Sequence, residues 1–264
     1  MNSHSSKKPK ELSLGESLEE TIANPDALDT VFSLAEIGID EMIEHLMKDV
    51  QDEALKEIPV VKTLYAITKT GFAIRDYFLL EKICRFILGC KEVKSEIQEK
   101  ITQKLSNQKD KKEIGKQIII ALDRFEQIQK TDILLKIFLA FAEEKITDKE
   151  FQSYIYVLDK IDINNIKILK IFYLLNILQK RDPVSSIHNT DAQQYAKDIK
   201  DNYFHLQNFA FLGLITLNLG SKEEKSDYNY LLRQWISSDE IHPGKFEPNG
   251  FGYKFLKIIN LINE

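Results

Sequence analysis

Apolar residues recur at steps of three and four along most of this 264-residue chain, the spacing that places them on one face of an α-helix. The clearest run follows Asn24-Pro25, an N-cap residue with proline at the first helical position, and continues to Leu46. Glycine and proline number only 10 and 6, fewer than the frequent turns of a sheet protein require. The sequence therefore predicts an all-α fold, a multi-helix bundle with a small C-terminal helical unit that carries at most a minor β element.

Charge is unevenly distributed and divides the predicted bundle. Residues 1–10 are polar and are expected to form a disordered tail. Residues 11–57, the acidic arm, hold 14 Asp or Glu and two Lys, whereas residues 58–130, the basic region, hold 15 Lys or Arg and nine acids. Both parts belong to a helical bundle that we expect over residues 11–181. A winged-helix-like C-terminal unit is expected over residues 184–264.

A broad apolar stripe runs from Pro59 to Leu88 in the basic region. It includes Gly71, which either breaks the helix or allows another helix to pack closely. Five cations frame the stripe and are the candidate contacts for a partner or a membrane surface: Lys62, Lys69, Arg75, Lys82 and Arg85. We expect the acidic arm to lie over this surface and to shield it until the arm moves. In the alternative, two solvated helix faces differ in sign without functional meaning.

Sequence patterns that carry catalysis are missing from the chain. None of the five histidines lies in a metal-binding pattern, and there is no phosphate-binding loop and no G-x-S-x-G. Cys84 and Cys90 fall on different helix faces, which predicts free thiols in a reducing cytoplasm. We therefore expect a non-enzymatic protein without metal or cofactor; an enzyme with an unrecognised site is the alternative.

The expected location is the cytoplasm, with peripheral membrane contact as a variant. The polar start of the chain has no apolar run behind it, so no signal peptide is expected. Residues 202–221 carry no formal charge, but His205, Gln207, Asn208 and Asn218 interrupt them. Because burying such groups in lipid is unfavourable, a packed helix followed by a strand or turn is the expected structure.

Two segments near the C-terminus, Leu206–Ile215 and Phe246–Leu256, are similar to a winged-helix pattern. In that pattern a helix ends in Gly-Leu-Ile and leads into a strand, and a last helix follows the wing. Asn249 takes the place of the usual threonine before the last helix, and Gly252 is the expected glycine. The two segments resemble the tails of bacterial abortive-infection proteins of the alpha type, a phage-defence group. A further helix predicted over Tyr228–Ser237 departs from a standard wing.

The resemblance implies a bacterial, defence-related role. Together with the charge pattern, it predicts an interaction module that binds a partner protein, a second copy or an anionic membrane surface through residues 59–88. The alternative is a nucleic-acid-binding regulator that uses Lys254 and Lys257 as phosphate contacts. Residues 184–264 hold eight Lys or Arg and ten acids, and phosphate neutralisation dominates nucleic-acid affinity, so this balance argues against nucleic acid.

Overall fold

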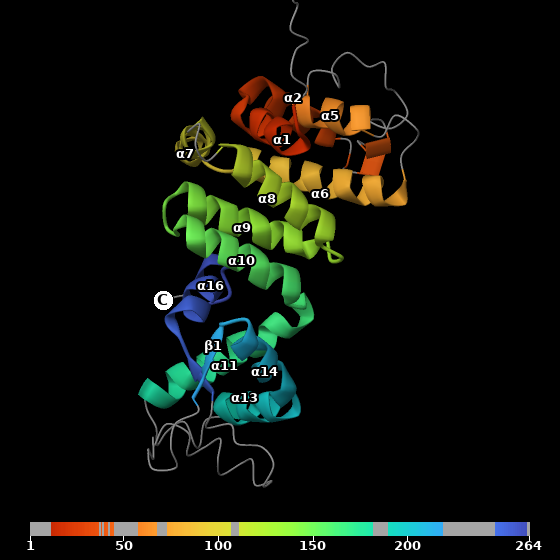
Figure 1. Ribbon diagram of the computed structural model, residues 1–264. Helices are drawn as coiled ribbons and strands as arrows, with labels where there is room; N and C mark the ends of the chain where they lie inside the picture. The colour runs from red at the N-terminus through yellow and green to blue at the C-terminus, as the bar shows by residue number, and fades with distance from the viewer. Residues whose placement is uncertain are drawn as a thin grey trace, which may run out of the picture. The chain divides into compact units, whose positions relative to one another are not determined.

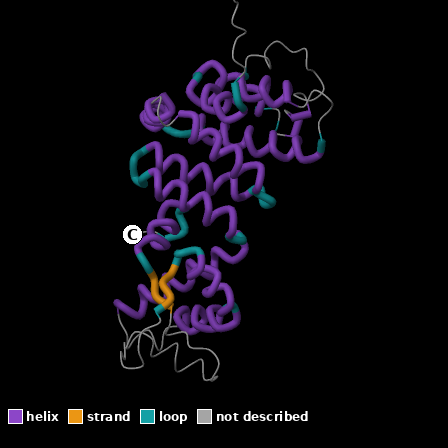
Figure 2. Tube along the Cα trace, in the orientation of Figure 1, coloured by secondary structure: helices purple, strands orange, loops and turns teal. Residues whose placement is uncertain are grey.

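The computed structural model of this chain describes residues 12–36, 38, 40–41, 43–44, 58–67, 73–106, 111–181, 190–218 and 246–262. Residues Met1–Phe151 and Gln152–Glu264 form two compact units, called unit 1 and unit 2 below. The division falls inside one helix, ahead of the boundary expected at Asp182-Pro183, which lies outside the described residues. Figure 1 labels the elements, and Figure 2 shows that the described part is helical apart from one small sheet. The predicted all-α class with a minor β element is confirmed.

Unit 1 begins its helices where the sequence shows capping chemistry. Its helices are α1 (Leu14–Ala23), α2 (Pro25–Ala35), α5 (Pro59–Ile67), α6 (Ile74–Lys91), α7 (Ser95–Ser106), α8 (Lys111–Arg124), α9 (Gln129–Ala142) and the start of α10 (Asp148–Lys160). Ser13 and Glu16 form a capping box at α1, and Asn24 accepts hydrogen bonds at the start of α2. Thr147 and Glu150, spaced as a capping box in the sequence, open α10 with hydrogen bonds of 2.8 and 3.2 Å.

Glycine positions change the predicted extent of two helices. The long helix expected after Asn24-Pro25 is wrong: α2 ends at Ala35, and Gly38 has φ +104°, a conformation that favours glycine. Gly89 directly follows the predicted apolar stripe, yet α6 continues through it to Lys91. A Cβ at Gly89 would overlap the side chain of Leu135 on α9. Gly89 therefore permits a close helix crossing and does not end α6.

The acidic arm packs on the basic region, as predicted. Helix α1 lies against α5, α7 and α8, and α2 lies against α6. The contact is apolar, with Leu18, Ile22 and Val31 buried, and each such side chain contributes roughly 1.5–3 kcal/mol. Within this contact, the N–H of Gly115 on α8 donates to the buried carboxylate of Glu19 at 2.6 Å. The arm is thus an integral layer of unit 1.

Unit 2 is arranged around a central helix. Its elements are the rest of α10, α11 (Ile163–Arg181), α13 (Thr190–Asp201), α14 (Tyr203–Phe211), β1 (Ile215–Leu217), β2 (Phe246–Pro248) and α16 (Gly250–Ile258). Helix α11 contacts α13, α14 and β2 and buries Leu169 and Phe172. The hydroxyl of Tyr173 donates to the Leu214 carbonyl at 2.6 Å and accepts from the Asn249 N–H at 3.0 Å. One tyrosine therefore ties α11 to β1 and to the start of α16.

The C-terminal elements follow the predicted helix, strand and helix order. The strand predicted after Gly213 is β1, which pairs antiparallel with β2 so that Leu217 lies opposite Phe246. Asn249 caps α16 by accepting a hydrogen bond from the Gly252 N–H at 2.8 Å. Two helices, α13 and α14, precede β1 and are separated at Asn202. The helix predicted over 228–237 lies outside the described residues.

Candidate functional site

Three of the predicted surface cations share one face of α6 and turn toward α8 and α9. Arg85 makes a bidentate ion pair with Asp132, with N–O distances of 2.7 and 2.8 Å. Arg75 pairs through two nitrogens with Asp123. Hydrogen bonding to these carboxylates raises the pKa of both guanidinium groups. These two charges are compensated within unit 1 by acids that lie outside the acidic arm.

Lys82, the third of these cations, is buried. Its ammonium group donates to the backbone carbonyls of Leu122 at 2.5 Å and Phe125 at 2.7 Å, at the carboxyl end of α8. A cation is favoured there because the last carbonyls of a helix carry partial negative charge. Burial lowers the pKa of Lys82, and the charges of Asp123 and Glu81 oppose this shift. Lys82 is a structural anchor for α8, and its selection as a surface contact for a partner was wrong.

Of the five predicted cations, few remain for an anionic surface. Lys62 is exposed on α5, and Lys69 lies outside the described residues. The Arg75 side chain is 75% exposed although it is paired. Lys91 of α6 forms an ion pair with Asp29 of α2 at 2.5 Å, a direct link between the acidic arm and the basic region. Acids outside the arm hold Arg75 and Arg85, so electrostatic shielding by the arm is not the main basis of its packing.

Exposed apolar side chains lie near the end of α5 and the start of α6, which residues 68–72 join in the sequence. We call them the apolar tip: Tyr65, Ile67, Ile74 and Phe78, with exposed fractions of 37, 65, 78 and 52%. Ile67 ends α5 and Ile74 begins α6 (Figure 1), so the intervening chain keeps their Cα atoms within about 25 Å. Exposed apolar clusters mark interaction surfaces more often than isolated exposed side chains do. The sequence placed these residues in the stripe without showing that they face outward.

In unit 2, the two lysines selected for phosphate contact lie on α16. Lys254 is half-buried and Lys257 is exposed, three residues further along the helix. Unit 2 also exposes Phe204 and Phe211 on α14, by 65 and 81%. Two neighbouring lysines can contact few phosphates, and this limits the salt-dependent affinity available to such a face.

Among the described residues, no group of three or more His, Cys, Asp or Glu is placed to hold a metal ion. No described helix combines the length and apolar character needed to cross a bilayer. Cys84 and Cys90 are buried in α6. Burial raises the pKa of the Cys84 thiol to about 12 and raises that of Cys90 further, so neither carries the thiolate that acts as a nucleophile.

This burial predicts protected thiols. We expect neither cysteine to react with a maleimide at neutral pH in the folded protein, and both to react after unfolding in guanidinium chloride. The folded pKa of Cys84 exceeds its ordinary value of 9.0, so the folded chain retains a proton that the unfolded chain releases. Its contribution to stability therefore falls as the pH rises from 9.0 toward about 12. Rapid labelling of the native protein, counted by mass spectrometry, would contradict the prediction.

The described residues thus present an exposed apolar tip, an internally compensated charged face on α6 and two buried thiols. Comparison of the chain with protein-family models, with curated proteins and with solved structures found no match.

Proposed function

We propose that this chain is a non-enzymatic interaction module that binds a partner protein through the apolar tip. The observation that carries the proposal is the exposure of Ile67 and Ile74, 65 and 78%, at the end of α5 and the start of α6. Covering both side chains would remove apolar surface from water, which favours association by about 25 cal/mol for each Å². Ile67 and Ile74 belong to residues 59–88, the region that the sequence predicts to bind a partner.

The charges around the apolar tip favour a protein over an anionic membrane. Arg75 is neutralised by Asp123, and Asp76 follows it in the first turn of α6. Tyr77 donates a hydrogen bond to Asp40 at 3.5 Å, which places another acid on this side of α6. A surface for anionic lipids needs uncompensated cations, each contributing about 1 kcal/mol. The exposed Lys62 is the observation that keeps a membrane surface as the second candidate.

The biological setting that we propose is antiviral defence in a bacterium. It rests on the resemblance of the two C-terminal segments to abortive-infection proteins of the alpha type. The pairing of β1 with β2 and the cap that Asn249 provides for α16 are compatible with a winged-helix-like unit. We propose that this unit serves protein contact, because its acids outnumber its lysines and arginines. Use of Lys254 and Lys257 for phosphate contact is the alternative.

Site-specific photo-crosslinking tests the tip directly. Benzoylphenylalanine at Phe78 replaces one exposed aromatic side chain by another, and the same probe at Tyr156 of α10, which is exposed to a similar degree, is the matched control. We expect a discrete adduct in the cells of origin at position 78 that is absent at position 156. An adduct of twice the chain mass would identify a second copy as the partner. Equal adducts at both positions, or none at position 78, would contradict a protein site at the tip.

Ile74→Asp should abolish partner binding while leaving the stability of the fold unchanged. Because Ile74 is 78% exposed, we expect its replacement to change the free energy of unfolding by less than about 0.5 kcal/mol. The adduct at position 78 should nevertheless disappear, since a charge in a covered apolar contact is unfavourable. Tyr156→Asp, at an exposed position outside the tip, should leave the adduct unchanged. Flotation with vesicles of phosphatidylglycerol and phosphatidylcholine tests the second candidate: vesicle binding that Lys62→Glu abolishes would favour the membrane surface.

A further inference from the structure

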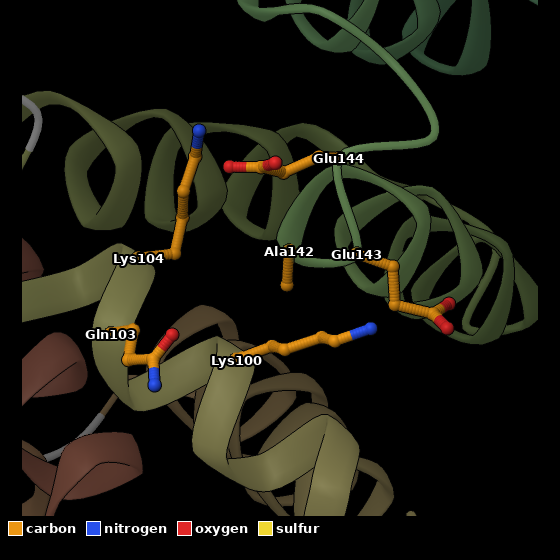
Figure 3. A pocket seen from close by; sticks show the side chains of 6 residues that line it. All are labelled: Lys100, Gln103, Lys104, Ala142, Glu143 and Glu144. Carbon is orange, nitrogen blue, oxygen red and sulfur yellow. The ribbon is translucent and has the colours of Figure 1, made fainter.

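A polar pocket lies in unit 1 between α7 and the end of α9. It has a volume of about 320 Å³. Its lining residues are Lys100, Gln103, Lys104, Ala142, Glu143 and Glu144. Figure 3 shows the two lysines and the glutamine rising from α7 on one side and the two glutamates at the end of α9 on the other. Ammonium groups and carboxylates therefore come from opposite walls of one cavity.

The lysine wall follows from helix spacing. Lys100, Gln103 and Lys104 stand at steps of three and four, so they occupy one face of α7. The ammonium group of Lys104 lies 4.4 Å from the ring centroid of Phe141, which itself stacks on Phe151. This cation–π contact orients Lys104 without neutralising it. The small side chain of Ala142 leaves the space between the walls open.

The carboxylate wall is formed by an unusual helix end. Glu144 has φ +58°, and its N–H donates to the Phe141 carbonyl at 3.0 Å. The next N–H, of Lys145, donates to the Ala140 carbonyl at 2.9 Å, which completes a helix-ending motif whose left-handed residue is most often glycine. A glutamate at this position strains the backbone and gives the pocket a carboxylate that glycine would not.

The two walls do not neutralise each other. Glu143 pairs with Lys145 on its own side of the pocket at 2.9 Å. Among the described residues no ion pair joins the lysine wall to the glutamate wall, although Lys104 and Glu144 point toward one another in Figure 3. A molecule that carries both charges can satisfy both walls at once, whereas a molecule with one charge meets repulsion from the opposite wall.

We propose that this pocket binds a small zwitterion, a molecule with one carboxylate and one ammonium group. The carboxylate would lie at Lys100 and Lys104, with Gln103 as a further donor. The ammonium group would lie at Glu144 and the carboxyl end of α9, where the helix carries partial negative charge. The volume of about 320 Å³ is at the lower end of small-molecule sites, which suits a ligand of amino-acid size.

Isothermal titration calorimetry with three probes tests the proposal on the full chain. γ-Aminobutyrate carries both charges, whereas butyrate and butylamine each carry one on a similar carbon skeleton. We expect γ-aminobutyrate to bind and the affinity of each control to be about fivefold lower. This factor corresponds to the loss of one partly screened ion pair. If butyrate binds as tightly as γ-aminobutyrate, the pocket is a simple anion site and the proposal is overturned. Failure of γ-aminobutyrate to bind would overturn it as well.

Two variants assign the binding to this pocket. Glu144→Gly removes the carboxylate and suits φ +58°, so its melting temperature should equal or exceed that of the original chain while γ-aminobutyrate affinity falls. Lys104→Met retains the aliphatic stem and should also weaken binding. Glu99→Gln, an exposed change on α7 outside the pocket lining, should not. Unchanged affinity in Glu144→Gly would place the ligand elsewhere. These outcomes are independent of partner binding at the apolar tip.

Discussion

Gly252→Ala should lower the free energy of unfolding of unit 2 by about 3 kcal/mol or more. This is the cost expected when a new side chain overlaps backbone that cannot move away. A Cβ at this position would overlap the Leu214 carbonyl group and the Tyr173 hydroxyl. The same hydroxyl holds the Leu214 carbonyl at 2.6 Å and the Asn249 N–H at 3.0 Å. A single methyl group would thus separate α11, β1 and α16 and leave buried polar groups without their hydrogen bonds.

Gly250→Ala provides the matched control in the same helix. A Cβ at Gly250 meets nothing within 4 Å, and the residue opens α16. The change should therefore be neutral or stabilise by about 0.5–1 kcal/mol, because alanine has less conformational freedom in the unfolded chain. Urea unfolding followed by circular dichroism compares the two variants. Equal midpoints for the two would show that α16 does not approach β1 as closely as described.

Lys82→Glu should be the most destabilising charge change in unit 1, with an expected loss of about 3–5 kcal/mol. The replacement puts a carboxylate against the carbonyl oxygens of Leu122 and Phe125 at the negative end of α8. It also removes the ammonium donor that satisfies both carbonyls. Lys82→Met, which keeps most of the aliphatic stem, should lose only about 1–3 kcal/mol because the carbonyls lose a donor without gaining a repulsion.

Lys62→Glu is the control for this series, because it makes the same charge change on an exposed residue of α5. We expect its unfolding free energy to stay within about 0.5 kcal/mol of the original value. The pH dependence gives a second check. Since burial lowers the pKa of Lys82 from its ordinary 10.5, the unfolded chain binds the proton more tightly. The contribution of Lys82 to stability therefore rises with pH as the pH approaches 10.5 from below, and Lys82→Met should remove this rise.

Helix starts were predictable because capping is a local interaction. Asn24-Pro25 and Thr147 with Glu150 lie within one turn of the backbone groups that they satisfy, so sequence spacing identifies them. Helix ends at glycines were not predictable in the same way. Both positions hold glycine, but Gly38 adopts φ +104°, whereas Gly89 faces Leu135 across a helix crossing. Only the neighbouring helix distinguishes the two uses of glycine.

The same limit applies to the candidate site. Lys62 and Lys82 both border the apolar stripe in the sequence. Lys62 is exposed, whereas Lys82 is only 6% exposed and its ammonium group lies against the end of α8. The partners of Arg75, Lys82 and Arg85 lie 40 or more positions away along the chain, beyond the reach of any periodicity argument. The pocket between α7 and α9 could not be predicted for the same reason, because its two walls come together only when both helices pack.

The sequence by itself determined the all-α class with its minor β element, the β1 strand and the helix starts with local caps, since these follow from local spacing and from the burial of apolar faces. It predicted the contact of the acidic arm with the basic region on electrostatic grounds, whereas the contact is apolar. Tertiary structure decided which charges stay in water, because an ion pair or a buried ammonium group depends on the element that lies opposite. It therefore moved the functional interpretation from the cations of α6 to the apolar residues where α5 ends and α6 begins.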